Sequence, residues 1–386
     1  MSTRKRHKAV IFGASGRVGL GLAYRLMTQG IDVVAVDIVE PCLLQQQFNR
    51  VQIDARIESD RAGRVLAVFG GFDVMNETRV AELLTAERAD VVVNYAIPFT
   101  WDATKQLSNY ARISRAGLGA FAAIQALAPL TIARAIANSG CDSLFLVGNL
   151  PDITIPVIHG CASTLGLALP VCGAGNVGLI EAAIRRELGA RRGMNAADLE
   201  ISLVAHHIHW VAPREPGYRN DAPFLLKVTE SGSDISSELG DLRALMNTSI
   251  VQGYEPGAGF SSTTALLAAE AIVALLGSER RRLHLPAPLG LPGGYPVIVS
   301  EGKVELDLPS EWSDEGVVTA MQQAQGLDGV SEIAADGAIH FDPDSVEILR
   351  EEMDFDLPIS VTPGDLCEVA TAQIAAAKFL VDAART

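Results

Sequence analysis

The chain has 386 residues, 48% hydrophobic and 20% charged, which is enough apolar material for two hydrophobic cores. Lys and Arg total 31 against 46 Asp and Glu, for a formal net charge of -15. A surface with this average charge repels phosphate backbones and anionic lipids, so neither nucleic acid nor a membrane is expected as a partner.

The cysteines and the apolar stretches indicate the compartment. Five cysteines lie far apart without a CxxC pair, which fits neither a disulfide framework nor a zinc knuckle. No apolar stretch reaches about 18 residues without a polar interruption, and the basic residues 2–6 run into a strand pattern without a signal-type cleavage site. We therefore expect a cytoplasmic, reduced protein.

Short apolar runs alternate with helical patterns over the first 190 residues, which is typical of parallel strands joined by crossover helices. The predicted strands are 9–12, 33–36, 65–69, 91–95, 143–147 and 169–172, and the predicted helices are 18–28, 78–87, 113–138 and 179–188. From residue 200, strand patterns at 201–204, 224–229 and 295–299 mix with helices at 264–276, 345–353 and 363–383. The fold class predicted is α/β: a Rossmann-type doubly wound parallel sheet at 1–190, followed by a mixed α/β substrate and catalytic domain at 191–386.

A glycine-rich turn (G-A-S-G-R-V-G, residues 13–19) lies between the first strand and the first helix. Such glycines permit a tight turn and the close approach of a pyrophosphate to the helix N-terminus. Asp37 ends the next strand, where its carboxylate accepts from both ribose hydroxyls of adenosine and repels a 2′-phosphate. These features predict NAD rather than NADP; a tight turn without a ligand is the alternative. The predicted contacts are Gly13, Ser15, Gly16, Arg17, Val18, Gly19 and Asp37.

Three later segments follow one another in the same order as in the lactate and malate dehydrogenase superfamily. The chain resembles this superfamily over residues 8–276. Residues 89–98 (A-D-V-V-V-N-Y-A-I-P) match its strand before the mobile loop, 146–152 (L-V-G-N-L-P-D) its Asn-Pro-Val-Asp segment, and 172–176 (C-G-A-G-N) the start of a helix. The resemblance implies that Ala96 and Asn149 contact the cofactor, with Asn149 also next to the reacting oxygen. It further implies a homodimer or homotetramer.

A histidine cluster (V-A-H-H-I-H-W, residues 204–210) follows a predicted strand where this superfamily has its catalytic histidine. His207 aligns best, and imidazole titrates in the range needed to take a hydroxyl proton while hydride leaves. The alternative is a set of packed strand residues without chemistry. We predict His207 as the acid/base, with His206 and His209 as the other choices.

The sequence departs from the superfamily where its members bind a carboxylate. Position 178, the place of the orienting aspartate, is glycine, and Glu181 replaces an arginine that binds substrate. Phe99 and Lys105 replace two loop arginines, so a 2-oxo dicarboxylate lacks its guanidinium partners. Lys105 is the expected catalytic cation of the loop. The predicted substrate contacts are Phe99, Asn176, Glu181, His209 and Ser261.

These residues predict an NAD-dependent oxidation of a secondary alcohol, or reduction of the ketone, on a small polar metabolite that is not a standard 2-oxo dicarboxylate. Residues 206–210 also resemble the Asn-His-x-x-Trp signature of the NAD-dependent glycosidases of the same superfamily. Those enzymes hold a metal through that histidine and a cysteine before the asparagine; here Gly175 takes the cysteine's place, and no metal is predicted. The alternatives are a glycosidase-like elimination and a non-catalytic NAD-binding sensor.

Overall fold

Six parallel strands form one sheet in the order β3-β2-β1-β4-β5-β6. The computed structural model describes residues 6–165, 171–175, 177–193, 195–219, 221–245 and 258–384. The strands of the sheet are β1 (Lys8–Phe12), β2 (Asp32–Val36), β3 (Val65–Phe69), β4 (Val91–Asn94), β5 (Leu144–Val147) and β6 (Val171–Gly173). The strand order reverses between β1 and β4, and in such folds ligands bind beyond the carboxyl ends of the strands at this point.

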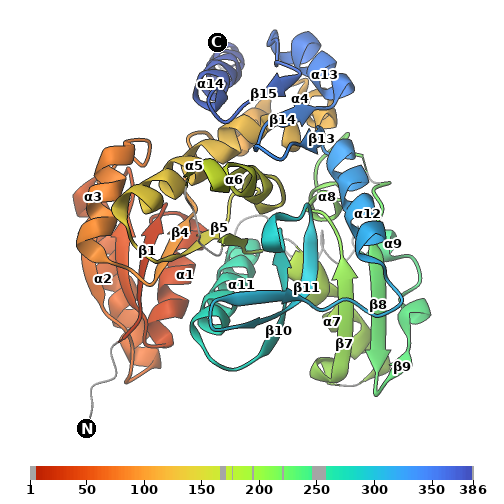
Figure 1. Ribbon diagram of the computed structural model, residues 1–386, viewed down its shortest axis with the longest axis horizontal. Helices are drawn as coiled ribbons and strands as arrows, with labels where there is room; N and C mark the ends of the chain where they lie inside the picture. The colour runs from red at the N-terminus through yellow and green to blue at the C-terminus, as the bar shows by residue number, and fades with distance from the viewer. Residues whose placement is uncertain are drawn as a thin grey trace.

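Helices cover both faces of the sheet because successive strand side chains point in opposite directions. Ala9 and Ile11 of β1 pack into one core with α1, α2 and α11, whereas Val10 and Phe12 pack into another with α3, α5 and α6 (Figure 1). These helices are α1 (Arg17–Thr28), α2 (Pro41–Glu58), α3 (Glu77–Glu87), α5 (Ala122–Ser139), α6 (Pro151–Leu165) and α11 (Ala258–Leu276). The predicted α/β class and Rossmann-type sheet are confirmed.

The second half of the chain carries small antiparallel sheets between helices. The strands are β7 (Leu199–Val204), β8 (Leu225–Glu230) and β9 (Ser233–Asp234); β10 (Arg281–Pro286), β11 (Gly294–Ser300) and β12 (Lys303–Leu306); and β13 (Val330–Ile333), β14 (Ile339–Phe341) and β15 (Ser360–Val361). The remaining helices are α4 (Tyr110–Ile113), α7 (Val177–Arg192), α8 (Ile208–Val211), α9 (Leu242–Leu245), α12 (Asp314–Leu327), α13 (Pro343–Met353) and α14 (Leu366–Ala383). A mixed α/β second half is therefore confirmed.

The last segment of the chain returns to the first half. Phe341, Leu349 and Ala370 share a buried core with Phe121 and Ile153, and α14 lies beside α5 at the top of Figure 1. The helix at Gly119–Ser139 is long and apolar enough to cross a membrane, but 83% of its most apolar stretch is buried inside the protein. The domain boundary predicted at residue 190 falls within α7 and stays a prediction.

Several helices differ from the sequence prediction, which contained neither α2 nor α6 nor α12. The missed helix α2 begins at Pro41 and buries Leu44, Phe48, Val51 and Ala55, an apolar stripe at helical spacing that its many polar residues obscured. The single helix predicted at 113–138 is interrupted: after α4 the chain turns at Gly117, whose φ is +80°, and α5 begins only at Ala122. A left-handed residue cannot continue a right-handed helix.

Candidate functional site

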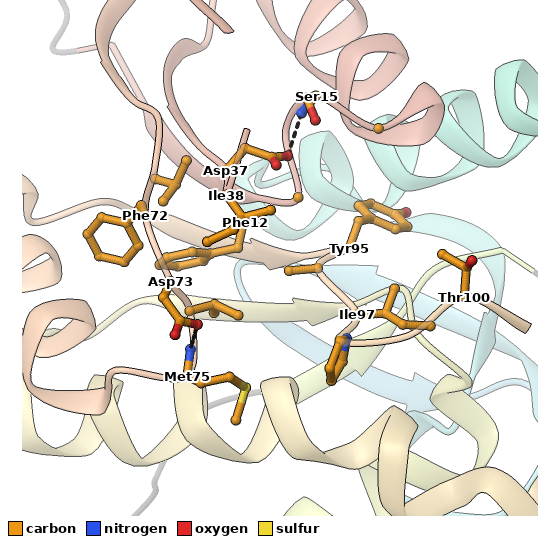
Figure 2. Close-up of a pocket in the computed structure, with 16 residues that line it drawn as sticks. Phe12, Ser15, Asp37, Ile38, Phe72, Asp73, Met75, Tyr95, Ile97 and Thr100 are labelled. Atoms are coloured by element: carbon orange, nitrogen blue, oxygen red, sulfur yellow. Dashed lines mark hydrogen bonds between the residues drawn. The ribbon is translucent and has the colours of Figure 1, made fainter. Parts of the chain in front are cut away.

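A pocket of about 560 Å³ opens at the carboxyl ends of β1, β2 and β4 (Figure 2). The glycine-rich turn forms one side of it, and the chain that follows β4 forms another. Its lining residues are Phe12, Gly13, Ser15, Gly16, Val36, Asp37, Ile38, Phe72, Asp73, Val74, Met75, Tyr95, Ala96, Ile97, Pro98 and Thr100. The sequence-predicted residues Gly13, Ser15, Gly16, Asp37 and Ala96 thus meet in one cavity at the switch point of the sheet.

The glycines of the turn are required by close backbone packing. Gly13 has a φ of +78°, and a Cβ atom on it would lie 2.5 Å from the Ala96 nitrogen. A Cβ atom on Gly19 would lie 2.4 Å from the Gly13 carbonyl oxygen, so Gly19 serves the turn. Arg17 is exposed and Val18 half-buried in the first turn of α1. The glycine-rich turn therefore packs against the backbone of the segment that follows β4.

Asp37 is fixed at the edge of the pocket by backbone donors. Its Oδ2 atom accepts from the Ser15 N–H at 2.8 Å (Figure 2). Its Oδ1 atom accepts from the Val39 N–H at 3.2 Å. A carboxylate has about four acceptor positions, so two bonds leave capacity for ribose hydroxyls. The side chain is 9% exposed, and its orientation is set before any ligand binds.

Asn149 lies beside this pocket, next to the lining residue Ala96. Its Nδ2 atom donates to the Ala96 carbonyl at 3.0 Å, and its Oδ1 atom accepts from Asn94 Nδ2 at 3.1 Å. Asn94 also accepts from the Ala96 N–H at 3.1 Å, so the two asparagines hold the chain after β4. Asn94 was not among the predicted site residues, although a polar residue ending an otherwise apolar strand is a usable signal.

His207 is buried between two carboxylates that are themselves 0% exposed. Its Nε2 atom lies 2.8 Å from Asp328 Oδ2 and its Nδ1 atom 3.4 Å from Asp152 Oδ2. Its backbone N–H donates to the same Asp152 oxygen at 2.7 Å. Burial disfavours the imidazolium, but the two carboxylates outweigh it and raise the pKa of His207 to about 10. Asp152 follows Asn149 by three residues, which links this cluster to the pocket.

Asp328 is the carboxylate closest to the His207 ring. It follows α12 and accepts from the Leu118 N–H at 3.2 Å, the Gly119 N–H at 3.1 Å and the Tyr218 hydroxyl. Sequence reasoning missed this residue because it lies more than 100 positions from His207 without a local motif. Burial and the neighbouring Asp328 raise the pKa of Tyr218 well above its usual range.

The other two histidines of the cluster differ in their partners. The Nε2 atom of His209 lies 3.1 Å from the Ala222 carbonyl oxygen and its Nδ1 atom 3.0 Å from the His206 carbonyl oxygen, so backbone groups occupy both nitrogens. The Nε2 atom of His206 is buried without a hydrogen-bond partner among the described residues. Burial and the nearby His207 lower the pKa of His206 to about 3, which keeps the ring neutral.

Glu181 borders a different, smaller cavity of about 150 Å³, together with Gly175, Gly178 and Glu270. Its carboxylate accepts from Arg185 Nη2 at 2.5 Å and lies 2.9 Å from His284 Nδ1. The Leu203 N–H donates to His284 Nε2 at 3.1 Å, which places the proton of a neutral His284 ring on Nδ1, toward Glu181. Although burial opposes it, these two partners lower the pKa of Glu181 to about 2.

The predicted loop cation Lys105 stands in the 3₁₀ helix Trp101–Gln106. Its Nζ atom lies 2.7 Å from Glu215 Oε1, and the Tyr110 hydroxyl donates to the other Glu215 oxygen at 2.6 Å. Phe99 is half-buried against the core that includes Tyr110. Asn176 lies outside the described residues, as does the side chain of Ser261, whose backbone belongs to α11.

The sequence matches no family model and no curated protein. Solved structures do match: a Cryptosporidium parvum malate dehydrogenase (TM-score 0.57, 17% identity, 84% of this chain and 98% of that chain) and an Eimeria maxima lactate dehydrogenase with NADH and oxamate (TM-score 0.56, 16% identity, 84% and 92%). A malate dehydrogenase from Picrophilus torridus gives a TM-score of 0.56 at 17% identity, and the match covers 84% of this chain and 97% of that chain. The chain has the fold of the malate and lactate dehydrogenases. The predicted resemblance is confirmed at the level of the fold.

Within this dehydrogenase fold, Glu181 makes a testable contribution to stability. Its folded pKa of about 2 lies below the unfolded value near 4.5, so the stabilisation is complete above pH 4.5 and disappears as the pH falls toward 2. Glu181→Gln should cost about 2 kcal/mol at pH 7, measured by urea unfolding, and the difference from wild type should vanish between about pH 4.5 and 2.

Glu270→Gln is the matched control for that measurement. Burial and the charge of Glu181 raise the pKa of Glu270, so removing its charge should cause no loss of stability at pH 7. A Glu181→Gln difference that does not change with pH would contradict the ion-pair explanation and assign the effect to packing.

Proposed function

We propose that this protein is a cytoplasmic NAD-dependent oxidoreductase, a homodimer or homotetramer that oxidises a secondary alcohol, or reduces the ketone, of a small polar metabolite. The observation that carries the proposal is the pocket at the β1/β4 switch point, where a glycine-rich turn, a fixed carboxylate and the chain after β4 surround about 560 Å³. The dehydrogenase fold supports it.

The residues of this pocket fit a nicotinamide dinucleotide. The Asp37 carboxylate retains acceptor capacity for ribose hydroxyls, and the turn at Gly13 and Gly16 presents the start of α1 to a pyrophosphate. Ala96 follows β4 and Asn149 follows β5, and the Asn149 amide donates to the Ala96 carbonyl; these two residues are proposed to lie toward the nicotinamide. When bound, NAD supplies a hydride acceptor; the protein's task is to bind it, exclude water and handle the hydroxyl proton.

The proton-handling part of the proposal is assigned to the buried cluster of His207, Asp152 and Asp328. Asp152 is three residues from Asn149, so one short segment connects the pocket with the cluster. Because the two carboxylates raise the pKa of His207 to about 10, the ring is protonated at neutral pH, and its proposed role is to donate the proton when the ketone is reduced. Lys105, placed in the loop after Pro98, is proposed to approach the reacting oxygen when that loop closes.

The substrate is proposed to lack the charge pattern of malate and lactate. Phe99 is an aromatic residue and Glu181 is an anion paired with Arg185, so neither provides a guanidinium for a substrate carboxylate. The test is absorbance at 340 nm with NAD or NADH over a panel of polyols, amino alcohols, hydroxy acids, oxaloacetate and pyruvate. We expect turnover of a neutral or amino-bearing alcohol and little or none of the two oxo acids. Efficient oxaloacetate reduction would refute the substrate assignment.

Two results would refute the dehydrogenase assignment itself. Release of a leaving group from a glycoside without net NADH would identify the elimination chemistry, and NAD binding without turnover of any substrate would identify a sensor. Each experiment uses the same full-length protein, so the three outcomes are directly comparable.

Cofactor choice depends on Asp37. Calorimetry should show tighter binding of NAD than of NADP, because the Asp37 carboxylate accepts from ribose hydroxyls and repels a 2′-phosphate. Asp37→Ala should narrow the difference by about 1–3 kcal/mol, the scale of a charge-assisted hydrogen bond. Asp73→Ala, at a carboxylate that also lines the pocket, is the control and should leave the preference for NAD intact. Tighter NADP binding by the wild type would overturn the assignment.

A further inference from the structure

Three potential metal-ligand side chains meet in the buried histidine cluster. One ligand atom each from Asp152, His206 and His207 lies within 4.8 Å of the others, and all three residues are buried. Among the described residues, Asp152 Oδ1 and His206 Nε2 have no hydrogen-bond partner. Unsatisfied buried polar atoms are costly, and several at one place indicate a missing ligand. We propose that Asp152, His206 and His207 bind one divalent transition-metal ion.

The spacing of two of these groups fits a shared ion. His207 Nδ1 and Asp152 Oδ2 are 3.4 Å apart. Two ligands at about 2.0–2.1 Å from one tetrahedral ion are separated by about 3.4 Å. The ligand atoms of all three residues lie within 4.8 Å of one another, an upper limit that exceeds the tetrahedral separation by about 1.4 Å.

Asp328 is placed to support the site without being a ligand. A metal-bound histidine commonly directs its other ring nitrogen to a carboxylate, which fixes the ring and its tautomer. His207 turns Nδ1 to the proposed ion and Nε2 to Asp328 Oδ2 at 2.8 Å. The backbone donors of Leu118 and Gly119 in turn hold Asp328. The cluster therefore has an inner set of ligands and an outer carboxylate that orients one of them.

Burial of the carboxylates also favours an ion. Asp152 and Asp328 place two fully buried carboxyl groups on either side of the His207 ring. A divalent cation at this position would compensate carboxylate charge, which is costly to bury without a partner.

Two imidazoles and one carboxylate select an ion such as Zn²⁺, Co²⁺ or Mn²⁺ over Ca²⁺ or Mg²⁺. The set contains no thiolate and therefore differs from the cysteine-containing site of the NAD-dependent glycosidases. It also goes beyond the proposed function, which assigns no metal ion to this cluster. Metal binding is measured without NAD or substrate, so its failure leaves the oxidoreductase proposal standing.

The experiment is equilibrium dialysis of the full-length, chelator-treated protein against Zn²⁺, followed by elemental analysis. We expect one ion per chain. Asp328→Asn should weaken binding roughly 10- to 100-fold, and Asp152→Asn and His206→Gln should weaken it further. His340→Gln, at a half-buried histidine on β14 outside the cluster, is the control and should bind as wild type does. Absence of stoichiometric binding, or wild-type affinity in folded Asp152→Asn, would overturn the proposal.

A measurement on the wild type covers the case in which the variants do not fold. X-ray absorption at the zinc edge should show nitrogen and oxygen neighbours at about 2.0–2.1 Å with imidazole scattering. Sulfur neighbours at about 2.3 Å would assign the ion to cysteines and overturn the site.

Discussion

Replacing His207 by asparagine is expected to lower kcat by roughly 100- to 10,000-fold, the range by which a positioned acid/base contributes to catalysis. The ring stands between Asp152 and Asp328, and both carboxylates are fully buried. The NAD dissociation constant should change little, because His207 does not line the nucleotide pocket. Steady-state turnover on the best alcohol of the substrate panel and calorimetry with NAD measure the two quantities separately.

His340→Gln provides the control for this measurement, because it removes a histidine from a strand far along the chain without touching the cluster. A thermal melt of each variant shows whether the protein stays folded. A folded His207→Asn protein with wild-type turnover would refute the assignment of the cluster to the reaction and direct attention to other groups near Asn149.

Gly13→Ala should destabilise the protein by about 3 kcal/mol and prevent NAD binding at concentrations that saturate the wild type. Its φ of +78° disfavours any side chain, and the new Cβ atom would meet the Ala96 nitrogen at 2.5 Å and the Tyr95 carbonyl carbon at 2.6 Å. These neighbours are backbone atoms of the chain after β4 and cannot move as a flexible side chain could. Urea unfolding and NAD calorimetry check both effects.

Gly71→Ala separates backbone strain from the steric clash. Gly71 has a φ of +61°, but a Cβ atom on it would meet no other atom within 4 Å, so the variant should lose only about 1 kcal/mol. NAD binding should persist. Equal destabilisation by the two substitutions would contradict the close packing between the glycine-rich turn and the chain after β4.

Local sequence patterns determined the Rossmann-type half of the protein. The strands of the parallel sheet are continuous apolar runs, and Gly13, Gly16 and Asp37 stand at fixed distances from the ends of two of them. Because the carboxyl ends of parallel strands share one edge, this spacing was sufficient to predict that these residues line one pocket. Such information is carried by residues a few positions apart.

Only the tertiary structure decided the partners of His207 and Glu181. The sequence showed glycine at position 178 and hence a histidine without its aspartate, whereas the fold brings Asp328 to 2.8 Å from His207. Glu181 turns toward His284, more than 100 residues away, instead of facing the nucleotide pocket. Such contacts depend on how separate sheets and helices pack, and a single buried carboxylate or imidazole leaves no periodic signal in the sequence.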